Sequence, residues 1–241
     1  MYSSTKGIVL HSVKYSDTSL IVTIYTARFG LQSYMVKGVR SKRARHRSAL
    51  FQPLQMLRLE VDYREKRKLN HLKEVKVDHA FQQADSNPVK RLVLLFLTEV
   101  LYRSLKENMP DQTLFDWLWQ ALIWYDLNTG KDTDFHLVFL LKLTQFLGFS
   151  PKLTEQNSFR YFDLLEGSFK GQEPAHPHYI TGESVEIFKK LLRSSFNDLA
   201  FLKLSHHERV DQLQYLMEYY RLHIENFGEI KSLEVIRDIL H

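Results

Sequence analysis

Residues 54–63 read Leu54-Gln-Met-Leu-Arg-Leu-Glu-Val-Asp-Tyr63, and this stretch alternates apolar and polar side chains. From Leu57 to Val61 every second residue is apolar, whereas the residues between them are charged. A period of two residues is typical of a β-strand that buries only one of its faces. The stretch therefore predicts a strand in a sheet that lies against a hydrophobic core.

Four other short runs in the first eighty residues have the β-branched or alternating composition of strands: residues 8–13, 20–25, 31–39 and 69–77. The alternation slips between Leu72 and Val75, which predicts a β-bulge. A long segment, Gly38–Pro53, separates the third strand from the fourth. Five strands with this connection favour an OB-fold barrel, whose ligands lie across strands two and three and the flanking loops. A sandwich of the same strands is the alternative.

Beyond Asn87-Pro88 the apolar spacing changes to that of helices. Helices are expected over residues 89–106, 111–127, 133–147, 184–194, 206–226 and 232–240. A stretch rich in Gly and Pro, at about 148–180, interrupts them, and a small hairpin is expected within it. The expected fold class is α+β, with an OB-fold domain over 1–80 and an α-helical domain over 81–241.

Charge is distributed unevenly between these two parts. Residues 1–80 hold 16 Lys/Arg against 6 Asp/Glu, a net of +10, whereas residues 81–241 hold 17 against 22, a net of −5. Such asymmetry indicates a nucleic-acid-binding or membrane-facing module. The chain has no cysteine, which excludes disulfides, thiolate metal sites and thiol nucleophiles. No apolar run approaches the roughly 18 residues of a membrane span, so a cytoplasmic protein is expected.

The densest positive charge lies between the third and fourth expected strands. Six of the eleven residues from 37 to 47 are basic: Lys37, Arg40, Lys42, Arg43, Arg45 and Arg47. Cations at this spacing suit a phosphate backbone. A second basic tip falls in the loop that OB-folds use for oligonucleotides, and it contains Arg64, Lys66, Arg67 and Lys68. Both loops are predicted to bind nucleic acid, and the alternative is a pair of solvated charged loops.

Tyr34 lies on the third expected strand, where an exposed ring could stack on a base. The alternative for this tyrosine is packing in the core. Enzyme signatures are absent, because the sequence has no Walker loop, no G-x-S-x-G elbow and no HExxH helix. Glu60 and Asp62 could serve a metal nuclease, but ion pairing on the barrel exterior is the simpler interpretation. We therefore expect no catalytic residue, no metal and no cofactor.

Several short motifs follow one another in a definite order: Lys6-Gly-Ile-Val-Leu10, Tyr15-Ser-Asp-Thr18-Ser-Leu-Ile, Gly30-Leu31, Val36-Lys-Gly-Val-Arg40, Leu50-Phe-Gln-Pro53-Leu, Leu147-Gly-Phe-Ser-Pro151, Phe162-Asp-Leu-Leu-Glu-Gly-Ser-Phe169 and Lys231-Ser-Leu233. Their order and spacing resemble those of the RecO family of bacterial recombination mediators. The resemblance runs over nearly the whole chain. It implies an N-terminal OB-fold and a C-terminal helical domain, in agreement with the patterns above.

The resemblance also implies a function. It implies binding of single- and double-stranded DNA, annealing of complementary strands, and help in loading recombinase onto DNA coated by single-strand binding protein. The implied partners are the RecR protein and the acidic C-terminal tail of single-strand binding protein, for which Arg103, Lys106 and Lys142 are the expected contacts. An RNA-binding OB-fold protein is the alternative, and a metal nuclease is a third hypothesis.

One departure from the family concerns zinc. Many members carry four cysteines in a zinc module where this chain has residues 152–178, and this chain has none. The hairpin is therefore expected to be metal-free and to be held by the packing of Tyr161, Phe162 and Phe169.

Overall fold

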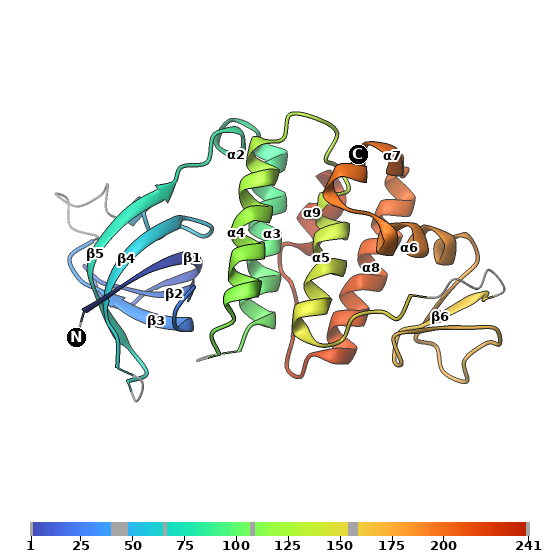
Figure 1. Ribbon diagram of the computed structural model, residues 1–241, viewed down its shortest axis with the longest axis horizontal. Coiled ribbons are helices and arrows are strands. Elements are labelled where there is room, and N and C mark those ends of the chain that lie inside the picture. The colour runs from blue at the N-terminus through green and yellow to red at the C-terminus, as the bar shows by residue number, and fades with distance from the viewer. Residues whose placement is uncertain (1, 40–47, 65–66, 107–108, 154–158, 240–241) are drawn as a thin grey trace. The chain divides into compact units, whose positions relative to one another are not determined.

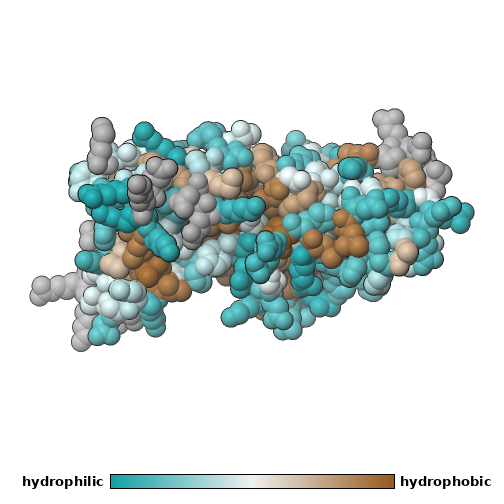
Figure 2. Space-filling model, turned by 90° about the horizontal axis from the view of Figure 1, so that it is seen from below, coloured by the Kyte–Doolittle hydropathy of each residue, from teal (hydrophilic) through white to brown (hydrophobic). Residues whose placement is uncertain are grey.

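The computed structural model describes residues 2–39, 48–64, 67–106, 109–153 and 159–239 (Figure 1). The chain divides into two compact units, Met1–Leu127 and Asn128–His241. Figure 2 shows one face of the molecule, which is covered mainly by hydrophilic residues and exposes hydrophobic residues in a few separate places. Within the described ranges, no helix is long and apolar enough to cross a membrane.

The first unit begins with a closed five-stranded barrel in the order β1-β2-β3-β5-β4. Its strands are β1 (Tyr2–Lys14), β2 (Leu20–Thr26), β3 (Gly30–Val36), β4 (Met56–Asp62) and β5 (Asn70–His79). Strand β1 pairs with β4 through its first half and with β2 through its second half. A short parallel pairing of β3 with β5 closes the barrel. The predicted OB-fold barrel is confirmed, and the sandwich is excluded.

Gly7 lies where β1 passes from one partner strand to the other. It pairs with Thr26 of β2 and with Leu57 of β4. A Cβ atom at this position would lie 2.6 Å from Cγ2 of Ile24 and 2.9 Å from Cδ1 of Leu59. Only a glycine lets the side chains of both neighbouring strands come this close, so Gly7 permits the tight closure of the barrel.

The β-bulge expected in the fifth strand is present. Glu60 of β4 pairs with Glu74, but the next residue, Val61, pairs with Leu72. Lys73 is therefore the extra residue, and it lies within the interval that the slipped alternation had indicated.

Three helices complete the first unit: α2 (Gln83–Ser86), α3 (Pro88–Ser104) and α4 (Gln112–Leu127). The side chain of Asn87 accepts hydrogen bonds from the backbone of Val89 and Lys90, and Pro88 occupies the first turn, so the sequence starts α3 at this point. The change of periodicity predicted a domain boundary near residue 80. The division into compact units lies later, after Leu127, because α3 and α4 pack on the barrel.

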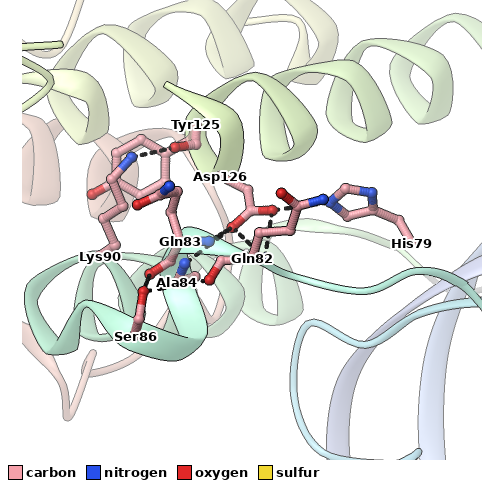
Figure 3. A network of polar contacts seen from close by, with 8 residues as sticks. All are labelled: His79, Gln82, Gln83, Ala84, Ser86, Lys90, Tyr125 and Asp126. Atoms are coloured by element: carbon pink, nitrogen blue, oxygen red, sulfur yellow. Dashed lines mark hydrogen bonds and ion pairs between the residues drawn. The ribbon is translucent and has the colours of Figure 1, made fainter. Parts of the chain in front are cut away.

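A buried carboxylate joins the end of the barrel to α4 (Figure 3). Asp126 is 0% exposed, and its oxygens accept hydrogen bonds from the backbone N–H groups of Gln82, Gln83 and Ala84 at 2.9–3.1 Å. Nε2 of His79, the last residue of β5, lies 3.1 Å from Oδ2 of the same carboxylate. Asp126 thus satisfies backbone donors at the start of α2 and fixes the connection between β5 and the helices.

The second unit contains α5 (Phe135–Leu147), a three-stranded sheet, α6 (Glu183–Arg193), the 3₁₀ turn η2 (Phe196–Asp198), α7 (Leu199–Leu202), α8 (His206–His223) and α9 (Leu233–Ile239). The sheet has the order β7-β6-β8, formed by β6 (Tyr161–Asp163), β7 (Ser168–Lys170) and β8 (Tyr179–Thr181). The expected hairpin is β6–β7. The third strand, η2 and α7 were not expected, because segments of three or four residues carry too little periodicity to be recognised.

Aromatic packing holds the hairpin, as the sequence predicted. The ring centroid of Phe162 lies 4.8 Å from that of Phe169 and 4.6 Å from that of Phe188 on α6. Tyr161 packs against Tyr179 of the added strand β8 with a centroid distance of 5.5 Å. The buried side chains of Phe162 and Phe169 therefore connect the small sheet to the helical core of this unit.

Candidate nucleic-acid interface

The described residues on either side of the first basic loop are anchored in the barrel. Lys37 is exposed directly after β3, but Val39 is 1% exposed and belongs to the barrel core. On the far side of the loop, Phe51 is 2% exposed and belongs to the same core. The loop thus leaves and re-enters the barrel at fixed points. Five predicted DNA-binding residues lie outside the described residues, and their role stays a prediction: Arg40, Lys42, Arg43, Arg45 and Arg47.

In the second basic tip, between β4 and β5, two arginines pair with the carboxylate of Asp62. Nη1 of Arg67 lies 3.4 Å from Oδ2 of Asp62, and Nε of Arg64 lies 3.9 Å from Oδ1. The Arg64 side chain is 66% exposed and that of Arg67 is 30% exposed, so Arg64 is the more accessible to a phosphate. Lys68 is exposed as well. Lys66 lies outside the described residues.

A buried amide, which the sequence reasoning missed, positions this tip. Asn70 is 0% exposed, and its Oδ1 accepts a hydrogen bond from the backbone N–H of Arg64 at 3.1 Å. Its Nδ2 donates to Oε1 of Gln32 on β3 at 3.3 Å. The amide therefore ties the basic tip to the neighbouring strand. Asparagine is depleted in strands. The presence of Asn70 near the start of the fifth expected strand is therefore the sequence signal that could have indicated a structural role for this residue.

Tyr34 does not provide a stacking surface, and this prediction was wrong. Its side chain is 0% exposed and belongs to the barrel core together with Val22 and Leu59. Burial raises the pKa of its hydroxyl well above the usual value. Along β3 the side chains alternate between the two faces, and the inward set includes Tyr34 and Val36.

The outer face of β1, β2 and β3, where an OB-fold ligand was expected, is divided into two halves. In the first half, the outward-pointing residues Ile8, Tyr25 and Leu31 are at most 4% exposed. The ring of Tyr25 lies 5.9 Å from that of Phe115 on α4, and its hydroxyl donates to the backbone carbonyl of Asp111 at 3.4 Å. Elements of the same unit therefore cover this half of the face.

A close backbone contact completes the covered half. Gly30 has a φ of +65°, and a Cβ atom there would lie 2.6 Å from the carbonyl oxygen of Met109. Glycine is thus required both by the left-handed backbone and by the approach of the segment that precedes α4. A ligand can therefore reach only the half of the outer face that α4 and the preceding segment leave uncovered.

The second half of the outer face is accessible. Val13, Ile21 and Met35 pair across β1, β2 and β3 and form one outward row. Val13 is 43% exposed, and Ile21 and Met35 are half-buried. Tyr15, in the turn after β1, is 61% exposed. We call Val13, Tyr15, Ile21 and Met35 the open strip.

The three residues predicted to bind a protein partner are distributed over both units. Arg103, in the last turn of α3, and Lys106, just after that helix, are exposed and belong to the first unit. Lys142, on α5 of the second unit, is half-buried. Burial lowers the pKa of His11 on β1, and the positive charge of Arg103 lowers it further. The ring of His11 stacks on that of Tyr102, with centroids 4.6 Å apart, so the last turn of α3 lies beside the outer face of the barrel.

The carboxylates considered for a nuclease are engaged in ion pairs. Oε2 of Glu60 lies 3.3 Å from Nζ of Lys73, and Asp62 holds the two arginines of the basic tip. In the second unit, His176 contacts the carboxylate of Asp163 at 3.2 Å. In the part of the chain that the structure describes, no group of three or more His, Cys, Asp or Glu side chains could hold a metal ion.

Comparisons with known proteins agree with this architecture. Residues 1–81 match the family model described as Recombination protein O N terminal, and residues 86–234 match Recombination protein O C terminal. Relatives named DNA repair protein RecO include those of Bacteroides fragilis, 38% identical over 240 residues, and Phocaeicola vulgatus, 35% identical over 239 residues. The protein of Flavobacterium johnsoniae is 34% identical over 241 residues, and each alignment covers 99% of both chains. The chain therefore belongs to the RecO family.

Proposed function

We propose that this chain is a DNA-binding recombination mediator of DNA repair that acts by binding and has no active site. One observation carries the proposal. The net charge of +10 in residues 1–80 is concentrated in the two loops that follow β3 and β4 of a closed five-stranded barrel. The relatives named as DNA repair proteins support DNA as the ligand.

The distribution of charge favours binding without sequence preference. Strands β2 and β3 contain no charged residue, so the cations of the two basic loops do not come from this pair of strands. Lysine and arginine side chains can neutralise the phosphates of single or double strands, and contacts to phosphates carry no sequence information. Two strands held in this way keep their bases available for pairing, which is what annealing of complementary strands requires.

We further propose the partners that the family resemblance implies. These are the RecR protein and the acidic C-terminal tail of single-strand binding protein, and through them the protein would assist recombinase loading in the cytoplasm. Arg103, Lys106 and Lys142 carry the charge that an acidic tail requires. We expect Lys142→Glu, or Arg103→Glu with Lys106→Glu, to weaken binding of a labelled tail peptide. The exposed Lys131→Glu is the control, and equal weakening by all variants would contradict the placement.

An RNA-binding function is the alternative. An RNA reader contacts the 2′-hydroxyl and so prefers RNA to DNA of the same sequence. We expect DNA and RNA oligonucleotides of one sequence to compete for the protein with DNA at least as effective. A clear preference for RNA would favour the alternative.

The test of DNA binding removes charge from the first basic loop. Arg43, Arg45 and Arg47 are replaced together by alanine, and affinity for single- and double-stranded DNA is measured by fluorescence anisotropy over a range of salt concentrations. Each phosphate neutralised contributes about −0.7 to −0.9 to the slope of log affinity against log salt, so the triple variant should flatten the slope by roughly two units. The weakening should be similar for every DNA sequence.

A matched control removes the same charge from the second unit. Lys131, Lys152 and Arg221 are exposed there, and their joint replacement by alanine also lowers the net charge by three. This control should leave the salt slope nearly unchanged. If the loop variant binds DNA with the wild-type affinity and slope, the first basic loop is only a solvated charge run. Binding would then have to rest on the second basic tip, Arg64, Lys66, Arg67 and Lys68.

A further inference from the structure

We infer that the open strip is the contact surface for the bases of a single DNA strand, and that Tyr15 stacks on one of them. The inference rests on the proposed function and assigns the part of it that distinguishes a single strand from a duplex. The outward row of Val13, Ile21 and Met35 is apolar and accessible, whereas the other half of the same face is covered by α4 and the segment before it. Unpaired bases have apolar faces, which a duplex keeps inside its stack.

The turn that carries Tyr15 has a defined backbone. The backbone N–H of Tyr15 donates to the carbonyl oxygen of Ser19 at 3.1 Å, and the N–H of Ser16 donates to the same oxygen at 3.4 Å. These bonds hold the turn while the Tyr15 side chain remains 61% exposed. A ring on a fixed backbone loses little conformational entropy when a base stacks on it.

Positive charge lies at one end of the open strip. The strand register aligns Lys14, Leu20 and Val36 in one row, so Lys14 and the exposed Lys37, the residue after Val36, lie at the same end of the barrel as Tyr15. The first basic loop leaves the barrel from this end, after Val39. Asp17 is the carboxylate of the turn, and it opposes only part of this charge. The complementary occupant is therefore a polyanion with apolar faces.

The other aromatic side chains beside the basic loops are less suitable. Phe29 and Tyr63 stack on each other, with centroids 4.1 Å apart, and both pack against the barrel core. Tyr34 is buried. Tyr2 is 58% exposed, but Nζ of Lys73 lies over its ring at 4.5 Å from the centroid. Tyr15 combines an accessible ring with cations at the same end of the barrel, whereas one face of the Tyr2 ring is already occupied by Lys73.

The experiment compares three DNA probes on the full chain. Fluorescence anisotropy is measured with oligothymidylate, with an abasic deoxyribose-phosphate strand of the same length, and with a duplex. Tyr15→Ala should weaken binding of oligothymidylate at least about fivefold, the lower bound for loss of one stacking ring, and should leave the abasic strand and the duplex nearly unaffected. Tyr15→Phe should bind all three probes like the wild type, because it keeps the ring.

Tyr2→Ala is the matched control, since it removes an equally exposed tyrosine from the opposite end of β1. The inference is overturned if Tyr15→Ala binds oligothymidylate normally, if it weakens all three probes equally, or if Tyr2→Ala has the same effect. A wild-type chain that binds none of the probes at low salt would instead refute the proposed function. Normal DNA binding by Tyr15→Ala, together with loss of an apolar peptide partner, would assign the open strip to a protein.

Discussion

Two tyrosines of the barrel differ in exposure although both belong to strand-rich sequence. Tyr34 is 0% exposed and Tyr15 is 61% exposed. The sequence placed Tyr34 on a strand correctly, but it could not show which face of that strand lies inside. Position 15 follows the end of an expected strand, where the alternation no longer indicates a face. The exposure of Tyr34 is therefore decided by the register of its strand, and that of Tyr15 by its place in the turn after β1.

A buried histidine in the second unit predicts a pH dependence of stability. His136 on α5 is 0% exposed. Burial lowers the pKa of His136 from 6.5 to about 3, and the positive charge of Arg209 contributes in the same direction. Above pH 6.5 the ring is neutral in both states. Below pH 6.5 the unfolded chain binds a proton that the folded chain does not, so the free energy of unfolding falls as the pH falls, by up to about 1.4 kcal/mol per pH unit.

Replacement of His136 tests this pH dependence of the free energy of unfolding. His136→Leu should reduce the slope of the free energy of unfolding against pH by about one proton between pH 5 and 6, measured by urea denaturation. His71 is exposed, so His71→Gln should keep the wild-type slope. An unchanged slope in His136→Leu would show that the ring is protonated or exposed in the folded state.

At the scale of elements, long periodic segments were predicted well, whereas most short ones were missed, the hairpin β6–β7 excepted. The helix expected over 111–127 is α4, and the slipped alternation of the fifth strand is the bulge at Lys73. The strand β8 and the helix α2 were missed, because each has only three or four residues. Such elements are stabilised by tertiary partners, as α2 is by Asp126, and not by their own periodicity.

Asp126 should be essential for the connection between β5 and the helices. In Asp126→Asn the amide NH₂ group would face backbone N–H donors, so we expect the free energy of unfolding to fall by roughly 2 kcal/mol or more. Urea denaturation measures this loss. Asp116→Asn makes the same change on the same helix at an exposed position, and it should cost less than about 0.5 kcal/mol. Equal effects of the two variants would refute the role of Asp126.

The small sheet of the second unit should need no metal. Aromatic packing of Phe162 with Phe169 and Phe188 holds β6 and β7 in place. We therefore expect a chelator to leave the melting temperature unchanged and elemental analysis to find no stoichiometric zinc. One zinc ion per chain, or unfolding by the chelator, would show that the contacts of His176 and Asp163 belong to a metal site.

At the scale of the whole molecule, the boundary between the two family models and the boundary between the two compact units fall at different places in the chain. The family models divide the chain between residues 81 and 86, in keeping with the change from strands to helices. The compact units divide after Leu127. The first boundary follows the pattern of the sequence and the second follows contacts, because Ile8, Tyr25 and Leu31 point out of the barrel and are nevertheless buried.

This difference predicts the behaviour of fragments. Residues 1–127 should unfold cooperatively on heating, because they retain the helices that cover the barrel. Residues 1–80 should aggregate or unfold at a lower temperature, since Ile8, Tyr25 and Leu31 would be exposed to water. Circular dichroism and light scattering measure both outcomes. A fragment 1–80 as stable as 1–127 would show that the barrel is an independent domain.

The sequence by itself determined the five strands, the long helices that follow them, the two basic loops and the absence of thiol chemistry, and it favoured the barrel over the sandwich. These follow from periodicity, composition and spacing, which are local properties of the chain. Only the tertiary structure decided that Tyr34 is inside, that Asn70 and Asp126 hold connections, and that helices cover half of the expected ligand face. These features depend on contacts such as Tyr25 with Phe115, ninety residues apart in the sequence, and no local pattern encodes such a contact.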